Sequence, residues 1–77
     1  MKTQILEILT EVRPDCDFEN SNNFLEDFWL DSFEIIEITE KLENVFGIKI
    51  DTAFIIPQNY ESAQAIEELI KKCRDNA

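Results

Sequence analysis

Hydrophobic residues recur at helical spacing near the start of the chain. The pattern predicts a helix over residues 3–12, with one apolar face made by Ile5, Ile8, Leu9 and Val12. Thr3 is placed to cap this helix, because a hydroxyl before the first turn can accept a bond from a free amide. Pro14 ends it, since the residue before a proline disfavours helical geometry.

Residues 14–31 form a long connection that is unusually rich in apolar residues. Turn-forming residues occupy much of its first half, namely Asp15, Asp17, Asn20, Ser21, Asn22 and Asn23. Large apolar residues accompany them, namely Phe18, Phe24, Leu25, Phe28, Trp29 and Leu30. A long loop inside a small domain is usually functional or packed. We therefore expect this connection to lie against the helices, with Phe18 and Leu25 as anchors.

A second helix is predicted over residues 32–46, ending at Gly47, which tolerates a positive φ. Its expected inward face is formed by Phe33, Ile36, Leu42, Val45 and Phe46, with Ile35 and Ile38 to one side. Every third residue along the helix is acidic, which gives a broad acidic stripe of Glu34, Glu37, Glu40 and Glu43.

The rest of the chain predicts a short turn of helix and then a last long helix. Residues 48–50 are expected to be extended, Asp51 to cap a short helix over 52–55, and Pro57 to close it. Ser62 is placed to cap the last helix, over residues 63–73, whose apolar stripe is Ala65, Ile66, Leu69, Ile70 and Cys73. The prediction is an all-α, small four-helix bundle in one domain, residues 1–77, with three main helices, a short third helix and a long first loop.

The charge of the chain restricts its partners. The formal net charge is −10, and residues 14–40 hold nine acids and no Lys or Arg. Nucleic acid and anionic membrane surfaces both require positive charge, so neither is an expected partner. A basic protein surface is favoured, because a surface of one sign steers association with a surface of the other. The alternative is that the acids only keep a small domain soluble.

The content of His and Cys excludes several kinds of chemistry. The chain has no His, and its two cysteines form no C-x-x-C motif, so zinc sites and His-based nucleophilic catalysis lack their usual groups. The first residues do not read as a signal peptide, and no apolar run has membrane-spanning length. We therefore expect a reduced, cytoplasmic setting without membrane insertion.

One segment of the first loop is similar to a calcium loop. Asp15, Asp17, Glu19 and Glu26 fall at positions 1, 3, 5 and 12 of that twelve-residue pattern. Asn20 replaces the usual glycine at the sharp turn, and Asn22 replaces an apolar residue. A solvated acidic loop is the simpler interpretation, and calcium binding is kept as an alternative.

Ser32 stands at the start of the predicted second helix and has two structural interpretations. The first is that Ser32 itself caps the helix. The other is that Asp31 caps it and Glu34 completes a capping box, which leaves Ser32 at the first helical position with a free hydroxyl. No triad partner is present in the sequence, so Ser32 is not predicted to be a self-activated nucleophile.

The surroundings of Ser32 resemble a known family. The stretch FLEDFWLDSFEIIEITEKLENVFGIKI is similar to the core of the acyl carrier and peptidyl carrier proteins. The family signature at the helix start corresponds here to Asp31-Ser32-Phe33, and the helix ends in a Phe-Gly-Ile-x-Ile pattern over residues 46–50. Downstream, Asp51 opens a short helix and Tyr60 stands shortly before the serine that starts the fourth helix. The resemblance extends over about residues 3–72.

The resemblance implies a function for Ser32 and its helix. In that family a separate phosphopantetheinyl transferase, using magnesium, moves 4′-phosphopantetheine from coenzyme A to the serine. The thiol of this arm then holds an acyl or aminoacyl group as a thioester, and the carrier itself catalyses nothing. The implied partners are a loading ligase and a downstream synthase or transferase with basic docking patches. The implied contact residues are Glu34, Ile35, Glu37, Ile38, Glu40 and Glu43, although core packing is the favoured interpretation of the two isoleucines.

Two departures from the family pattern bear on the pathway. The bulky residues 27–30 stand where a glycine is common, and Phe33 replaces the common leucine. These features are more similar to D-alanyl and other stand-alone carriers than to the housekeeping fatty-acid carrier. A specialised pathway is therefore the first expectation, and fatty-acid synthesis the second; polyketide and nonribosomal-peptide pathways belong to the same range.

Two further expectations follow. In a monomeric bundle of this type, Cys16 and Cys73 lie near opposite ends, so no bridge between them is expected. A degenerate carrier would be an acidic adaptor without a prosthetic group, and it would bind a basic protein through the second helix.

Overall fold

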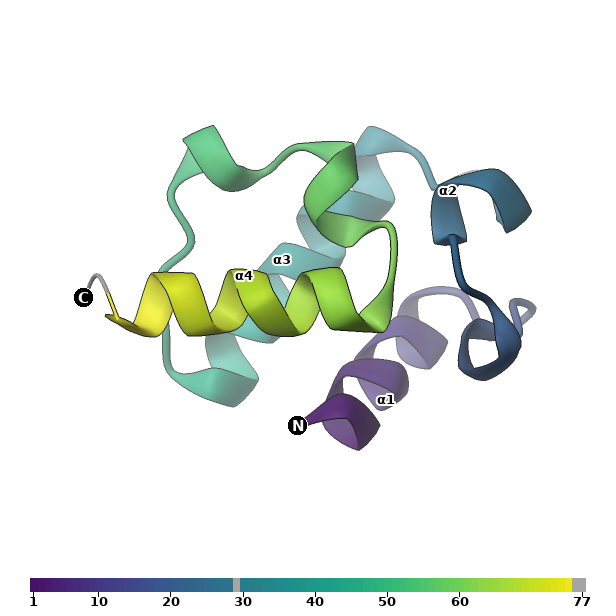
Figure 1. Cartoon of the computed structure of the whole chain (residues 1–77), viewed down its shortest axis with the longest axis horizontal. Coiled ribbons are helices and arrows are strands. Elements are labelled where there is room, and N and C mark those ends of the chain that lie inside the picture. The colour runs from purple at the N-terminus through teal and green to yellow at the C-terminus, as the bar shows by residue number, and fades with distance from the viewer. Residues whose placement is uncertain (29, 76–77) are drawn as a thin grey trace.

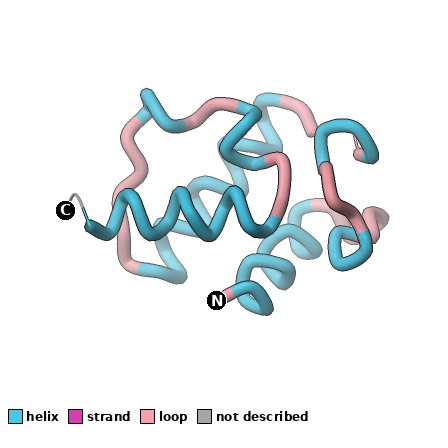
Figure 2. The backbone as a smooth tube through the Cα atoms, viewed as in Figure 1, coloured by secondary structure: helices cyan, strands magenta, loops and turns pink. Residues whose placement is uncertain are grey.

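The computed structural model describes residues 1–28 and 30–75, and within them it is helical without any strand (Figure 2). The helices are α1 (Lys2–Val12), α2 (Phe24–Asp27), α3 (Ser32–Phe46) and α4 (Ala63–Asp75). Three 3-10 segments join them, namely η1 (Phe18–Asn20), η2 (Thr52–Phe54) and η3 (Pro57–Tyr60). The predicted all-α class is confirmed.

The helices enclose one core. α1 packs against both α3 and α4, while η3 packs against α4 and α2. In Figure 1, α4 runs across the front of the molecule to the C-terminal end, and α3 passes behind it. The core residues include Ile5 and Leu9 of α1, Leu42 of α3 and Ile66 and Ile70 of α4, all of them fully buried. Their burial supplies the main driving force for folding.

The long first connection is ordered by a capped turn of helix. The Asn23 side chain accepts bonds from the amides of Leu25 and Glu26, so α2 begins at Phe24. Phe24 is fully buried, and its ring meets that of Phe18 edge-on with centroids 5.0 Å apart. Phe18 is confirmed as an anchor. Leu25 is partly buried and packs against the core as predicted, and Phe24 is a further, fully buried anchor. Trp29 lies outside the described residues.

Local capping explains most of the helix boundaries. Gly47 ends α3 with φ 63°, as predicted. The Asp51 carboxylate accepts from the Ala53 amide at 2.9 Å, and the Ser62 hydroxyl accepts from the Ala65 amide at 3.0 Å, so both predicted caps are confirmed. The cap predicted at Thr3 is wrong. α1 begins one residue earlier, with Met1 at the cap position and no side-chain bond there.

The segment after Pro57 holds a buried polar contact. Pro57 opens η3 rather than only closing the turn before it, and this short helix carries Tyr60 into the core. The Thr39 hydroxyl donates to the Ile35 carbonyl at 2.8 Å, so the Tyr60 hydroxyl donates to Thr39 Oγ1 at 2.6 Å. Burial raises the pKa of Tyr60. The bond fixes η3 against the middle of α3.

Candidate functional site

The N-terminus of α3 is closed by a capping box. Asp31 Oδ1 accepts from the Glu34 amide at 2.9 Å, and Glu34 Oε1 accepts from the Asp31 amide at 3.1 Å. The interpretation of Ser32 as the cap is therefore wrong, and the alternative with Asp31 as the cap is confirmed. Sequence alone left both open because either side chain has an oxygen within reach of the free amides.

Ser32 occupies the first helical position with its side chain exposed. Within residues 1–28 and 30–75, its hydroxyl has no hydrogen-bond partner. The capping box uses the amides of Asp31 and Glu34, whereas the first amides of any α-helix lack an intrahelical acceptor. The helix dipole adds positive potential at the same end. An anionic phosphoryl group bonded to the Ser32 oxygen fits this position.

Arg13 connects the end of α1 to the capping box. Its Nη1 atom donates to both carboxylate oxygens of Glu34, at 2.9 and 3.1 Å. Its Nε and Nη2 atoms each donate to one oxygen of Asp15 at 3.1 Å. The guanidinium holds the pKa of the Asp15 carboxyl below its usual range, and the bonds to Asp15 and then Glu34 raise the pKa of Arg13. No pattern in the sequence indicates this role of Arg13.

The orientation of α3 corrects the predicted inward face. Ile35, Ile38 and Leu42 are buried, whereas Phe33 is 84% exposed and Ile36 is 48% exposed. Val45 is exposed as well, so three of the five residues expected inside lie outside, while Leu42 is buried and Phe46 partly buried. The buried face of the helix is the one that carries apolar residues and no charged residue. Ile35 and Ile38 are core residues, so a surface contact with partners through them is ruled out in this arrangement.

The acidic stripe divides into bound and free carboxylates. Glu34 is held by Arg13 and the Asp31 amide, and Glu43 Oε2 accepts from the Ile50 amide at 2.8 Å. Glu37 and Glu40 are exposed, and neither has an ion pair within the part of the chain that the structure describes. We define the outer face of α3 as Phe33, Ile36, Glu37 and Glu40, which follow one another at helical spacing next to Ser32.

The arrangement of the described residues gives the calcium-loop alternative no support. The described residues contain no group of three or more acids or cysteines that could hold a metal ion. Asp15 is bound by Arg13, and Asp17 accepts from the Asn20 side-chain amide at 2.8 Å. Glu19 on η1 and Glu26 on α2 are exposed and belong to separate elements. The segment folds into two short helices, which keep the four carboxylates from converging.

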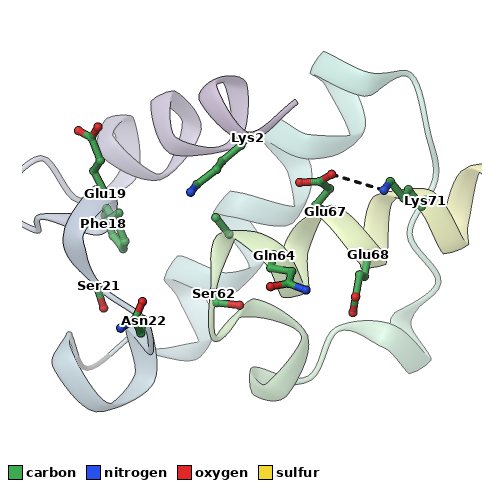
Figure 3. A pocket seen from close by; sticks show the side chains of 11 residues that line it. Lys2, Phe18, Glu19, Ser21, Asn22, Ser62, Gln64, Glu67, Glu68 and Lys71 are labelled. Atoms are coloured by element: carbon green, nitrogen blue, oxygen red, sulfur yellow. Dashed lines mark ion pairs between the residues drawn. The ribbon is translucent and has the colours of Figure 1, made fainter.

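A surface groove of about 540 Å³ opens beside the first turns of α4 (Figure 3). Its lining comes from the start of α1, from the η1 segment and from the first turns of α4, and includes Lys2, Glu19, Glu67, Glu68 and Lys71. Lys71 pairs with Glu67 at 3.4 Å inside it. A second groove of about 350 Å³ lies between α1 and α3 and is lined in part by Glu11, Lys41 and Val45. Neither groove includes Ser32.

Cys16 and Cys73 are both free thiols, in agreement with the expectation that they do not form a disulfide. Cys73 is buried on α4, and Cys16 is partly buried after the end of α1. Burial raises the pKa of each thiol. Burial therefore disfavours the thiolate form of both cysteines.

The arrangement around α3 agrees with the family that the sequence matches. The model of the phosphopantetheine attachment site family matches residues 3–70, so the chain belongs to this family. Members are carriers to which 4′-phosphopantetheine is covalently attached, and their domains are not catalytic. Comparison with curated proteins and with solved structures gives no match. No helix in the described residues is long and apolar enough to cross a membrane.

Proposed function

We propose that Ser32 is the attachment residue and that the protein carries an acyl or aminoacyl group as a thioester on 4′-phosphopantetheine. The observation that carries this proposal is the division of roles at the helix start. Asp31 caps α3, so the neighbouring Ser32 is exposed and its hydroxyl has no structural task. Within a family defined by this attachment, an exposed serine at a helix N-terminus is the group that fits.

The attachment step needs little from the carrier itself. The Ser32 oxygen forms a phosphodiester with the phosphorus next to pantetheine in coenzyme A, the diphosphate bond breaks, and adenosine 3′,5′-bisphosphate leaves. The Ser32 proton passes to a base on the transferase, because the chain has no His and the described residues offer the hydroxyl no partner. The magnesium that the transferase uses neutralises the diphosphate. Ser32 contributes an accessible oxygen at the positive end of a helix.

We infer that partner enzymes dock on the outer face of α3. Phe33 and Ile36 offer exposed apolar surface beside Ser32. Glu37 and Glu40 continue the same face with exposed carboxylates that have no ion pair among the described residues. A partner with an apolar depression next to basic side chains is complementary to this face. Glu34 and Glu43 are left out of the docking set because intramolecular bonds hold their carboxylates. The partners in question are the transferase, a loading ligase and a downstream synthase or transferase.

The cargo pathway is proposed from the same face. A large phenylalanine exposed directly after the attachment residue favours partners built to accept it, and so a specialised pathway such as D-alanyl transfer over housekeeping fatty-acid synthesis. Polyketide and nonribosomal-peptide pathways are the other specialised candidates. We also propose a monomeric protein with a single domain. Its two free thiols agree with a reducing compartment such as the cytoplasm.

Intact mass spectrometry tests the attachment. The protein is incubated with coenzyme A, magnesium and a transferase of broad specificity, alongside Ser32→Ala and the control Ser21→Ala. Wild type and Ser21→Ala are expected to gain the mass of one phosphopantetheine, and Ser32→Ala none. Thermal melting checks that Ser32→Ala is folded. Modification of Ser32→Ala would refute the assignment; failure of folded, unmodified wild type with several transferases would favour the adaptor without a prosthetic group.

A further inference from the structure

Arg13 is fixed in place by the way α1 ends. Pro14 prevents the helix from continuing, and Arg13 becomes its C-cap residue with φ −135° and ψ 81°. The Arg13 amide still donates to the Leu9 carbonyl at 2.8 Å, so its backbone stays attached to the last turn. The side chain leaves the end of α1 at a defined point and reaches the first turn of α3.

The contact with Glu34 joins two hydrogen-bond systems through one carboxylate. Glu34 Oε1 accepts from Arg13 Nη1 and from the Asp31 amide, both at 3.1 Å, while Oε2 accepts from Arg13 at 2.9 Å. The two side chains are 27% and 19% exposed, so solvent screens this pair less than an open surface pair. Asp15 accepts two bonds from the other edge of the guanidinium, which restricts its orientation.

A second ion pair between the same two helices provides a comparison. Lys41 of α3 reaches Glu11 of α1 at 3.3 Å through a single contact, and their side chains are 36% and 65% exposed. Lys41 lies on the third turn of α3, away from Ser32, and touches no helix cap. Arg13 therefore differs from Lys41 in the group that it holds: the carboxylate that completes the cap beside the proposed attachment residue.

We propose that Arg13 is a positioning residue for the modification of Ser32, acting through Glu34 and the capping box. The inference rests on the proposed function. Arg13 holds the Glu34 carboxylate on the Asp31 amide, which fixes the first turn of α3 and with it the direction of the Ser32 oxygen. Reaction rates fall steeply when a reacting oxygen is displaced or left mobile, even though binding is preserved. The positioning acts on the turnover step rather than on docking, because Arg13 lies outside the outer face of α3.

Steady-state kinetics of phosphopantetheine transfer test this with the full chain. Arg13→Gln is expected to lower kcat about tenfold with KM nearly unchanged, and Glu34→Gln to lower it by a similar factor. The matched control Lys41→Gln removes the same charge and the other α1–α3 pair, and it is expected to stay within about twofold of wild type. Arg13→Lys keeps the charge but not the two-pronged geometry, and is expected to fall between.

A second measurement reports on the contact itself and does not require the proposed function. Hydrogen exchange of the Asp31 amide, followed by NMR, is expected to accelerate in Arg13→Gln and to match wild type in Lys41→Gln. Equal kinetics and equal exchange in these two variants would overturn the proposal, as would an Arg13→Gln effect confined to KM. If wild type were not modified at all, the proposed function would fail while the exchange comparison still tested the contact. Should Arg13→Gln not fold, Arg13→Lys is judged against Lys41→Gln by the same two measurements.

Discussion

The two faces of α3 are built from similar residues but face different surroundings. The inner face presents Ile35, Ile38 and Leu42 to the core, together with the hydroxyl of Thr39. The outer face presents Phe33 and Ile36 to solvent, together with Glu37 and Glu40. Each face therefore has isoleucine, and the identity of a side chain does not reveal which face it serves. The polar groups do: Thr39 is satisfied internally, whereas the two outer carboxylates have no ion pair within the described residues.

This difference separates stability from recognition within one helix. An apolar side chain that touches only its own chain contributes to folding, and its loss leaves a cavity. An apolar side chain that stands in solvent contributes little to folding, and neighbouring ones can form a contact surface for a partner, as proposed for Phe33 and Ile36. Substitutions on the inner face should therefore change stability, and substitutions on the outer face should change the encounter with a partner.

Ile38→Ala on the inner face should have the largest effect. Ile38 is fully buried, so truncation removes apolar contacts and leaves a cavity, with an expected cost of about 2–5 kcal/mol in the free energy of unfolding. Urea unfolding followed by circular dichroism measures it. A cost below about 1 kcal/mol would show that Ile38 is not in the core.

Glu43→Ala tests whether the Glu43 carboxylate stabilises the fold. Its carboxylate accepts the Ile50 amide at 2.8 Å in a partly buried setting, and removal should cost about 1–2 kcal/mol. Glu40→Ala is the matched control on the outer face, expected to change stability by less than about 0.5 kcal/mol. Equal costs for the two variants, measured by urea unfolding, would contradict the division of the acidic stripe.

Tyr60→Phe tests the polar contact on the inner face. At neutral pH it should cost about 1 kcal/mol, because Thr39 keeps its bond to the Ile35 carbonyl. The raised pKa of Tyr60 means that the folded state keeps its proton when the unfolded chain has lost it. Wild-type stability should therefore fall as pH rises above about 10. This fall should be smaller in Tyr60→Phe; parallel stability curves from pH 8 to 11 would count against a buried hydroxyl.

Ile36→Ala on the outer face should leave stability within about 0.5 kcal/mol of wild type, since alanine favours the helix and little burial is lost. Its effect should appear instead in the encounter with a partner, as a raised KM for the transferase with kcat retained. Glu37→Gln should raise KM as well, with a weaker dependence on salt than wild type. A stability loss like that of Ile38→Ala would place Ile36 in the core after all.

The features predicted correctly from sequence are those set by a few neighbouring residues. The bounds of α3, the glycine at its end and the caps at Asp51 and Ser62 each depend on contacts within a few positions along the chain. The inward face of α3 was predicted wrongly because apolar residues occur on both sides of that helix. The positions of the charged residues distinguish the two faces. Glu37 and Glu40 share a face with Phe33 and Ile36, which indicates that this face is exposed to solvent.

The pairing of Arg13 with Glu34 had no comparable local signal. The two residues are 21 positions apart, and nothing in the sequence specifies which of the nearby acids a base will meet. The contact depends on how the end of α1 is placed against the start of α3, which packing of the whole core decides. The same holds for Tyr60, whose resemblance to a family position was visible while its bond to Thr39 was not.

Because Asp31 rather than Ser32 caps α3, the proposed modification of Ser32 leaves the cap of this helix intact. Among the described residues the Ser32 hydroxyl makes no hydrogen bond, so the proposed conversion of this hydroxyl to a phosphodiester breaks none of their contacts. The protein without phosphopantetheine, with phosphopantetheine and with a loaded thioester can then share one conformation at the N-terminus of α3. Under the proposed function, an enzyme that distinguishes a loaded carrier from an unloaded one would recognise the arm and its cargo rather than the start of α3.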